Sequence, residues 1–380
     1  MKRIKLFQIV LTIVTAVLLS INVDAGNEQR GGSSGASELL INPWARSSGM
    51  GNSSVASIRG LESVFMNVAG LAHTERTELV FTNTQWFQGT GIVLNSFGFA
   101  QKVGEAGVMG ISAMSMSFGD LIKTTSELPE GGIGTFSPNF ATITLSYARE
   151  FSNSIYGGFN AKIINESIYN LNVSGFALDA GIQYVTGFGR DKAGNRKRDN
   201  IRFGITMQNW GTTMQYAGEG MAFYGLSANG ADMTVEHRSQ SFELPSLLRI
   251  GFAYKALLGA KVDEERSTVH SDHVLIIAAN FTAHSFTRDQ IHFGMEYGYK
   301  NIMYLRGGYI YEEGITSIDN RLTAFTGPTA GMTINIPTSK DGDGVIGIDY
   351  SYRLTNPFGG VHTFGARVTL GGEGVDAPRY

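Results

Sequence analysis

The sequence predicts an all-β fold, a transmembrane antiparallel β-barrel of about fourteen strands with an N-terminal hatch, or plug. Charged residues make up only 17% of the 380 residues, whereas about 25% is usual in soluble proteins. Glycine is abundant, with 49 residues, and 11% of the chain is aromatic, which suits strands and tight turns. A net charge of -3 provides no basic surface for nucleic acid, so that class of partner is excluded.

The first 25 residues have the pattern of a secretory signal peptide. A basic start precedes an apolar run from Leu6 to about Leu19, and a small-residue cleavage site ends at Ala25. The apolar run is shorter than the roughly 20 residues that a membrane-spanning helix needs. We therefore expect Sec-type export with cleavage before Gly26, and delivery to the outer membrane of a Gram-negative bacterium.

Strands are predicted by alternation of apolar residues with small or polar ones. No later segment approaches the roughly 18 consecutive apolar residues of a membrane helix, so a membrane-embedded chain must cross as strands. In the window 201–208, isoleucine, phenylalanine and methionine alternate with arginine, glycine, threonine and glutamine. Similar windows begin at Ile291, Ile346 and Thr363. Less regular strands are expected at about 77–86, 91–102, 106–119, 139–150, 154–166, 174–187, 247–257, 273–284, 301–312 and 322–337. The total of about fourteen is even, as bacterial barrels require.

The connections between these strands alternate in length. Residues 120–138, 210–245 and 312–321 form long connections, as expected for extracellular loops, whereas most of the others are short. Two inner connections, 188–200 and 258–272, are long and charged, which indicates solvated loops. Four aromatic residues near strand ends are expected at the membrane interface, in contact with the loops: Trp86, Phe87, Trp210 and Phe358.

A soluble β-sandwich or propeller would show similar alternation, but would expose a polar face to water. Here the face opposite the apolar residues is rich in glycine and in isolated charges of both signs. Such a face is typical of a narrow, hydrogen-bonded barrel interior. We expect these charged side chains to face the lumen: Lys162, Asp179, Arg202, Arg249, Lys255, Glu296, Arg306, Asp349, Arg353 and Arg367.

The segment before the first strand differs from the rest of the chain. It is rich in small residues and contains stretches that are too short and too polar to span lipid. Apolar residues such as Leu39, Trp44 and Phe65 favour packing within the lumen over a loose periplasmic lead-in. The predicted organisation is therefore a signal peptide at 1–25, a lead and lumenal hatch at 26–76, a barrel at 77–373 and a tail at 374–380.

No pattern of catalytic residues appears in the sequence. The Asp341–Gly344 run lacks the later ligands of a calcium loop and is expected to turn a hairpin. No nucleophile and base occur at a recognisable spacing, and neither phosphate-loop signature is present. We therefore predict a protein that is not an enzyme and that carries no cofactor and no metal.

Within and beyond the hatch, an ordered set of motifs resembles the PorV/PorQ family of Bacteroidota, itself similar to the FadL-type long-chain fatty acid transporters. The hatch motifs are Ala45-Arg46-Ser47-Ser48-Gly49-Met50-Gly51, Ser54-Val55-Ala56 and Asn67-Val68-Ala69-Gly70-Leu71, with Val68 where the family has proline. The barrel motifs are Asn209-Trp210-Gly211, Glu243-Leu244-Pro245, Leu248-Arg249-Ile250-Gly251, Glu296-Tyr297 and Leu305-Arg306-Gly307-Gly308-Tyr309.

This resemblance implies an adaptor or shuttle of the type IX protein secretion system. Such proteins bind the translocon and cargo that carries a C-terminal signal domain, and the long outer loops would be the contact surface. The alternative is a FadL-like channel for hydrophobic small molecules, in which the hatch and the lumen would be the working surface. A structural barrel without traffic of its own is a third possibility.

Overall fold

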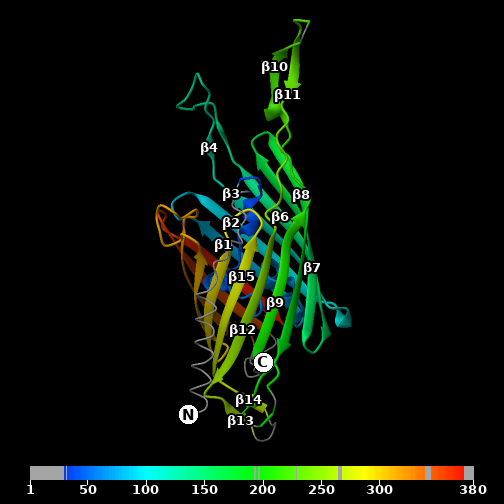
Figure 1. Cartoon of the computed structure of the whole chain (residues 1–380), viewed down its shortest axis with the longest axis vertical. Coiled ribbons are helices and arrows are strands. Elements are labelled where there is room, and N and C mark those ends of the chain that lie inside the picture. The colour runs from blue at the N-terminus through cyan, green and yellow to red at the C-terminus, as the bar shows by residue number, and fades with distance from the viewer. Residues whose placement is uncertain are drawn as a thin grey trace.

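Fourteen strands of the computed structural model close into one antiparallel barrel, which confirms the predicted fold class (Figure 1). The structure describes residues 30, 32–191, 194–195, 197–227, 229–263, 268–338 and 344–371. The predicted signal peptide, the predicted turn at 341–343 and the predicted tail at 374–380 lie outside these residues. Each barrel strand pairs with the next one along the chain, and β20 pairs with β1 to close the ring.

The barrel strands lie close to the positions predicted from the alternation. For example, the strand expected at 174–187 spans 171–186, and the one expected at 322–337 spans 325–337. The barrel consists of β1 (Thr77–Trp86), β2 (Ile92–Lys102), β3 (Val108–Ser117), β6 (Asn139–Ser152), β7 (Ile155–Ile168), β8 (Leu171–Thr186), β9 (Ile201–Gly211), β12 (Leu247–Leu258), β15 (His273–His284), β16 (Gln290–Tyr299), β17 (Met303–Glu312), β18 (Phe325–Pro337), β19 (Gly344–Thr355) and β20 (Val361–Leu370).

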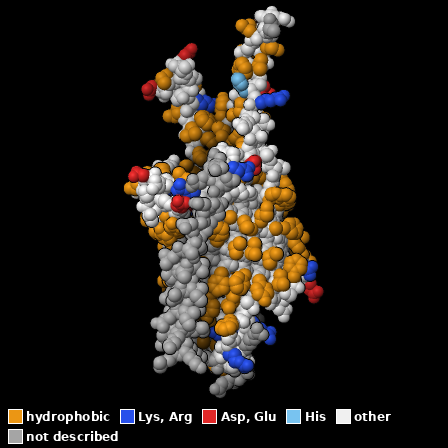
Figure 2. Space-filling model, in the orientation of Figure 1, with side chains coloured by type: hydrophobic (Ala, Val, Ile, Leu, Met, Phe, Trp, Pro, Cys, Tyr) orange, Lys and Arg blue, Asp and Glu red, His pale blue; other side chains and the backbone are white. Residues whose placement is uncertain are grey.

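The outer surface of the barrel is apolar. Alternate side chains along each strand point outward, so that Phe81, Ile205 and Ile348 are each about half exposed while their neighbours in sequence are buried. Figure 2 shows hydrophobic side chains spread over the barrel wall. A surface of this kind is stable against lipid and not against water, and barrel closure leaves no unpaired sheet edge in the membrane.

Three of the predicted connections are not irregular loops but contain short hairpins. They hold β4 (Leu121–Ile122) with β5 (Thr135–Phe136), β10 (Ala222–Leu226) with β11 (Asp232–Glu236), and β13 (Lys261–Asp263) with β14 (Thr268–His270). The first two hairpins project from one end of the barrel and the third lies at the other (Figure 1). We call residues 118–138 the short arm, residues 212–246 the long arm, and their side of the barrel the arm end.

The described residues of the N-terminal segment include four short helical turns. They are η2 (Ser37–Leu40), α2 (Ala45–Gly49), η3 (Leu61–Phe65) and η4 (Val68–His73). These turns contact strands all around the barrel, with α2 against β17 to β20, η3 against β1 and β2, and η4 against β3, β6, β7 and β8. In the described part of the chain, no helix is long and apolar enough to cross a membrane.

Candidate functional site

The hatch runs through the lumen from the arm end to the opposite end. Ser34 forms a β-bridge with Glu243 at the base of the long arm, and the chain then descends to Thr77, where β1 begins at the other end of the barrel. Within this path, Trp44, Leu61 and Met66 are completely or almost completely buried. The described residues of the hatch, 30 and 32–76, therefore fill the interior rather than hang below it.

Side chains of the barrel wall hold the main chain of the hatch. Gln183 of β8 donates hydrogen bonds to the carbonyl oxygens of Val55 and Ile58 at 3.1 Å each. These bonds satisfy main-chain groups that regular secondary structure leaves open. Equivalent bonds to hatch carbonyls come from Asn160, Gln208, Arg249, Asn280, His292 and Thr329. Of these residues, Arg249 is among the charges predicted to face the lumen, and Gln208 and His292 lie on the polar faces of predicted strands, whereas Asn160, Asn280 and Thr329 were not predicted.

Asn67, one of the predicted hatch residues, connects the hatch to itself and to the wall. Its side-chain amide donates to the carbonyl oxygens of Val55 at 3.1 Å and of Ile182 at 3.0 Å. Its side-chain oxygen accepts from the N–H of Ala69 and so caps the first turn of η4. The side chain is fully buried, so each of these bonds replaces one to water.

Inward-facing glycines make room for the hatch. A Cβ atom at Gly331 would lie 2.9 Å from Cα of Gly49, and one at Gly204 would lie 2.9 Å from Cα of Ala56, both too close for real contacts. Several of these glycines face each other across neighbouring strands. The facing pairs are Gly158 with Gly181, Gly204 with Gly251, and Gly294 with Gly308. Of the predicted hatch residues, Gly49, Met50 and Gly51 meet the wall at such positions.

Gly70 and Leu71, also predicted hatch residues, pack elsewhere. A Cβ atom at Gly70 would collide with the carbonyl oxygen of Ile58, so this glycine allows two passes of the hatch to approach each other closely. Leu71 is fully buried and lies near Gly110 on β3. Both residues therefore contribute to the packing of the plug.

Most of the charged side chains predicted to face the lumen do so in pairs or networks. Arg306 Nε lies 2.5 Å from Oε2 of Glu296, and Arg306 also donates to Thr333, which donates in turn to Asp349. Arg202 and Lys255 share Asp199 of the connection 187–200, at 3.8 and 2.8 Å. Pairing of this kind offsets the cost of removing the charges from water.

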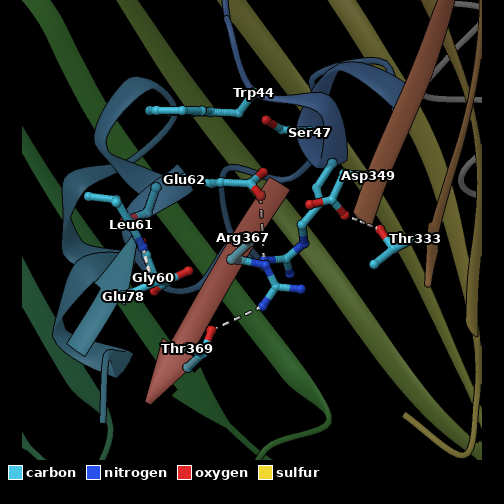
Figure 3. A network of polar contacts seen from close by, with 12 residues as sticks. Trp44, Ser47, Gly60, Leu61, Glu62, Glu78, Thr333, Asp349, Arg367 and Thr369 are labelled. Atoms are coloured by element: carbon cyan, nitrogen blue, oxygen red, sulfur yellow. Dashed lines mark hydrogen bonds and ion pairs between the residues drawn. The ribbon is translucent and has the colours of Figure 1, made fainter. Parts of the chain in front are cut away.

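One group of charged side chains lies where the hatch meets β18 to β20. Glu62 of η3, Asp349 and Arg367 point towards one another in the lumen (Figure 3). Arg367 donates to Asn335 at 3.1 Å and to Thr369 at 3.5 Å, and Arg46 lies 4.0 Å from Glu62. Burial raises the pKa of Glu62 to about 7, although the positive charge of Arg46 acts in the opposite direction.

A small cavity borders this network. Its volume is about 30 Å³, and Arg46, Met50, Ile276, Glu296 and Arg306 are among its lining residues. Such a volume is sufficient for a water molecule rather than for an organic ligand.

The lumen is not polar on every side, which corrects the predicted charge-lined interior. On β1, β2, β3 and β6 apolar side chains point inward near the arm end, and they include Leu94 and Met114, both buried against the hatch. The sequence pattern assigned apolar side chains to the lipid face alone. Here apolar side chains also line part of the lumen. This inner wall consists of Trp86, Ile92, Leu94, Met114, Met116, Phe118 and Phe140.

The predicted interfacial aromatics separate into two places. Trp86, Phe87 and Phe358 gather with Phe325 at the rim of the arm end, with ring centroids 4.7 to 5.6 Å apart. The guanidinium of Arg353 lies over the Phe325 ring at 3.9 Å. Trp210 lies apart, pointing outward from β9 with 64% of its surface exposed.

Comparisons with known proteins agree with the fold. No protein-family model and no curated protein matches the chain. Among solved structures, the toluene transporter TodX of Pseudomonas putida is 13% identical over 86% of this chain and 97% of its own, with a TM-score of 0.52. A FadL homologue of Pseudomonas aeruginosa is 11% identical over 87% of this chain and 97% of its own, with a TM-score of 0.45. The likeness to TodX shows that this chain has a FadL-like barrel fold, and nothing in these comparisons bears on the PorV/PorQ family.

Proposed function

We propose that this protein is an outer-membrane channel that takes up hydrophobic small molecules from the exterior of the cell. The observation that carries this proposal is the apolar inner wall of β1, β2, β3 and β6, which extends from the rim of the arm end to the hatch. The inner part of this wall packs against the hatch, whereas nearer the rim Trp86, Phe118 and Phe140 are only partly buried and leave an apolar surface at the mouth. A channel for a hydrophobic guest requires one.

The arm end would face the outside of the cell. Long loops of bacterial barrels are extracellular and short turns are periplasmic, and both long hairpins project from this end (Figure 1). The first and last barrel strands begin and end at the opposite side, where Thr77 pairs with Leu370. A guest would therefore meet the rim aromatics first and the hatch last.

The two sides of the lumen would then serve different functions, since one would contact the guest and the other would hold the hatch. Ile92, Leu94 and Met114 offer dispersion contacts and no hydrogen-bond donors, which suits a guest without polar groups. The opposite side, from β7 to β18, holds the hatch main chain through polar side chains. Passage would require the hatch to move, since its described residues fill the lumen. The fold shared with a toluene transporter supports this proposal.

Uptake by intact cells tests the proposal. Cells lacking this protein should accumulate labelled toluene or a labelled long-chain fatty acid more slowly than complemented cells. The variant Met114→Gln places a polar group in the apolar wall and should lower uptake several-fold. Ser112→Ala lies on the same inward face of β3 and should leave uptake unchanged. Equal uptake by deleted and complemented cells would contradict the proposal.

A second candidate function, the type IX secretion adaptor, is favoured by the arms. Tyr224 and Leu226 on the β10–β11 hairpin are 88% and 75% exposed, and Ile122 on the short arm is 62% exposed. Isolated two-stranded hairpins are marginally stable in water, and apolar side chains on them are typical of protein contacts. The partners would be the type IX translocon and cargo with C-terminal signal domains.

Deletion of residues 219–238, the outer part of the long arm, separates the two functions. Loss of type IX secretion with normal uptake of the labelled probes would support the adaptor. Loss of uptake through Met114→Gln with normal secretion would support the channel. The deletion leaves the arm base at 212–217 in place, where Met214 and Ala217 form β-bridges with Phe242 and Asn172.

A further inference from the structure

We propose that Glu38, Glu166 and Tyr216 form a proton-operated latch that fastens the start of the hatch to the base of the long arm. We call residues 32–41 the hatch lead. The proposal concerns the coupling between the plug and the arm. It stands whether the protein works as a channel or as an adaptor.

The hatch lead and the arm base are joined through their main chains. Ser34 forms a parallel bridge with Glu243, and Gly35 N–H donates to the Glu243 carbonyl at 3.1 Å. Met214 forms an antiparallel bridge with Phe242. The lead, the two sides of the arm base and the start of β8 thus make one small sheet, so a movement of the arm base must move the lead.

Apolar side chains close this sheet over the barrel wall. Ala36 and Leu39 of the lead pack with Met214 and Leu244 of the arm base against β7 and β8. The wall contributes Ile164, Val173 and Ala177. The lead is therefore docked by a modest apolar cluster, in which any buried charge has a large effect.

Two carboxyl groups lie inside this dry environment. Glu38 and Glu166 are 2% and 3% exposed, and the negative charge of Glu166 acts on Glu38. Among the described residues, neither carboxyl oxygen of Glu38 has a hydrogen-bond partner. The hydroxyl group of Tyr216, on the arm base, donates a hydrogen bond to Glu166. Two neighbouring buried carboxyl groups repel each other when both are charged, so the closed latch is most stable when one of them holds a proton.

Among the residues that the structure describes, no cation compensates the second negative charge. Lys162, lower on β7, is paired with Asp179 of β8 at 2.7 Å, and Arg30 is paired with Glu243 of the arm base at 2.6 Å. The remaining charges of the arm near this point, Glu219 and Arg238, are exposed. In the described part of the chain, Glu166 is the charged group that acts on Glu38.

Burial, followed by the negative charge of Glu166, raises the pKa of Glu38 from 4.5 to about 8. Burial, followed by the hydrogen bond to Glu166, raises the pKa of Tyr216, so this phenol keeps its proton. Because the pKa of Glu38 is higher in the docked state, docking is most stable below about pH 4.5 and weakens as the pH rises through 8. When both carboxyls are charged, their repulsion favours release of the lead and of the arm base.

Hydrogen–deuterium exchange of the full-length protein in detergent, corrected for intrinsic exchange rates, tests the latch. Between about pH 6 and about pH 9, amides of the lead and of residues 212–217 should lose at least about tenfold of their protection. Amides of β19, on the opposite side of the barrel from β7 and β8, should show no such change. Glu38→Gln keeps the shape and removes the charge, so protection of both segments should become independent of pH.

Two further variants complete the test. Glu166→Gln should also remove the pH dependence, and it provides a second reading if Glu38→Gln folds poorly. Glu127→Gln changes an exposed carboxyl on the short arm and should behave like the unmodified chain. Constant protection in the unmodified protein, or the same loss of protection in Glu38→Gln and in the unmodified protein, would overturn the proposal. Neither outcome depends on the uptake measurements.

Discussion

Lys162 Nζ lies 2.7 Å from Oδ2 of Asp179 across β7 and β8, and the two side chains are 3% and 0% exposed. Asn160 donates to the same carboxylate at 2.8 Å, and the N–H of Asn209 donates to its other oxygen at 2.8 Å. The pairing of β8 with β9 shifts register at this point. The ion pair therefore occupies a β-bulge, where it satisfies main-chain groups that the ladder leaves open.

The variant Lys162→Met should lower the free energy of unfolding by about 3–5 kcal/mol, because it leaves a buried carboxylate without its cation. The double variant Lys162→Met/Asp179→Asn should lose less, since no uncompensated charge remains. Urea unfolding of the barrel in lipid vesicles, followed by tryptophan fluorescence, measures both values. A double variant at least as unstable as the single one would show that the pair contributes more than charge compensation.

The glycines that face the hatch test how closely the hatch packs against the barrel wall. A Cβ atom at Gly308 would lie 2.6 Å from the carbonyl oxygen of Met50, whereas one at Gly307 would meet no atom within 4 Å. Gly308→Ala should therefore cost about 1–3 kcal/mol through overpacking, and Gly307→Ala should cost little. We expect Gly308→Ala to expose the hatch to protease and to sensitise cells to large antibiotics that the outer membrane excludes. If the two variants were equally sensitive to protease and to antibiotics, the hatch would not be closely packed against Gly308 of β17.

The barrel could be predicted from the sequence because the alternation that identifies a strand involves neighbouring residues only. In a strand, Phe203 and Ile205 point to lipid while Arg202 and Gly204 point inward, so the sequence period reports the environment on each side. The hairpins in the arms could not be predicted this way. Phe223 and Tyr224, adjacent in β10, are both exposed, so the strand shows no alternation between a buried and a solvated face.

The lumen was predicted only in part. Charged residues such as Arg306 stand out in an apolar strand, but Asn160 and Gln183 are of types as common in loops as in a lumen, and only the folded register brings them to the hatch. The apolar inner wall was missed for a related reason. Leu94 faces inward and Phe97 outward, yet both are apolar, so alternation cannot distinguish a lumen lined with apolar side chains from lipid.

Asn67 should be essential for holding the hatch to the wall. Asn67→Asp keeps the shape and the cap on Ala69 but cannot donate to the carbonyl oxygens of Val55 and Ile182. Leaving two buried acceptors unsatisfied beside a new negative charge should cost at least about 2 kcal/mol. Asn165→Asp, at an exposed position of β7, is the matched control. Thermal unfolding of the two variants in the same detergent measures the difference, and similar midpoints would contradict the role of Asn67.

The stability of the centre of the hatch should depend on pH through the carboxyl group of Glu62. Because burial raises its pKa from 4.5 to about 7, the packing of η3 should be most stable below about pH 4.5 and should weaken as the pH rises through 7. Exchange of the amides at 61–66 measures this locally, apart from the latch at Glu38. Protection should fall with pH in the unmodified protein and stay constant in Glu62→Gln.

Arg46 sets the size of that effect. Its positive charge, 4.0 Å from Glu62, opposes the rise in the pKa of the carboxyl. In Arg46→Gln the pKa of Glu62 should rise further, so the loss of protection at 61–66 should be larger and should extend to higher pH. The double variant Arg46→Gln/Glu62→Gln should lose the dependence altogether. If Arg46→Gln instead leaves the pH profile unchanged, the neighbouring cations Arg306 and Arg367 must govern Glu62, and Arg46 serves only to pack the hatch.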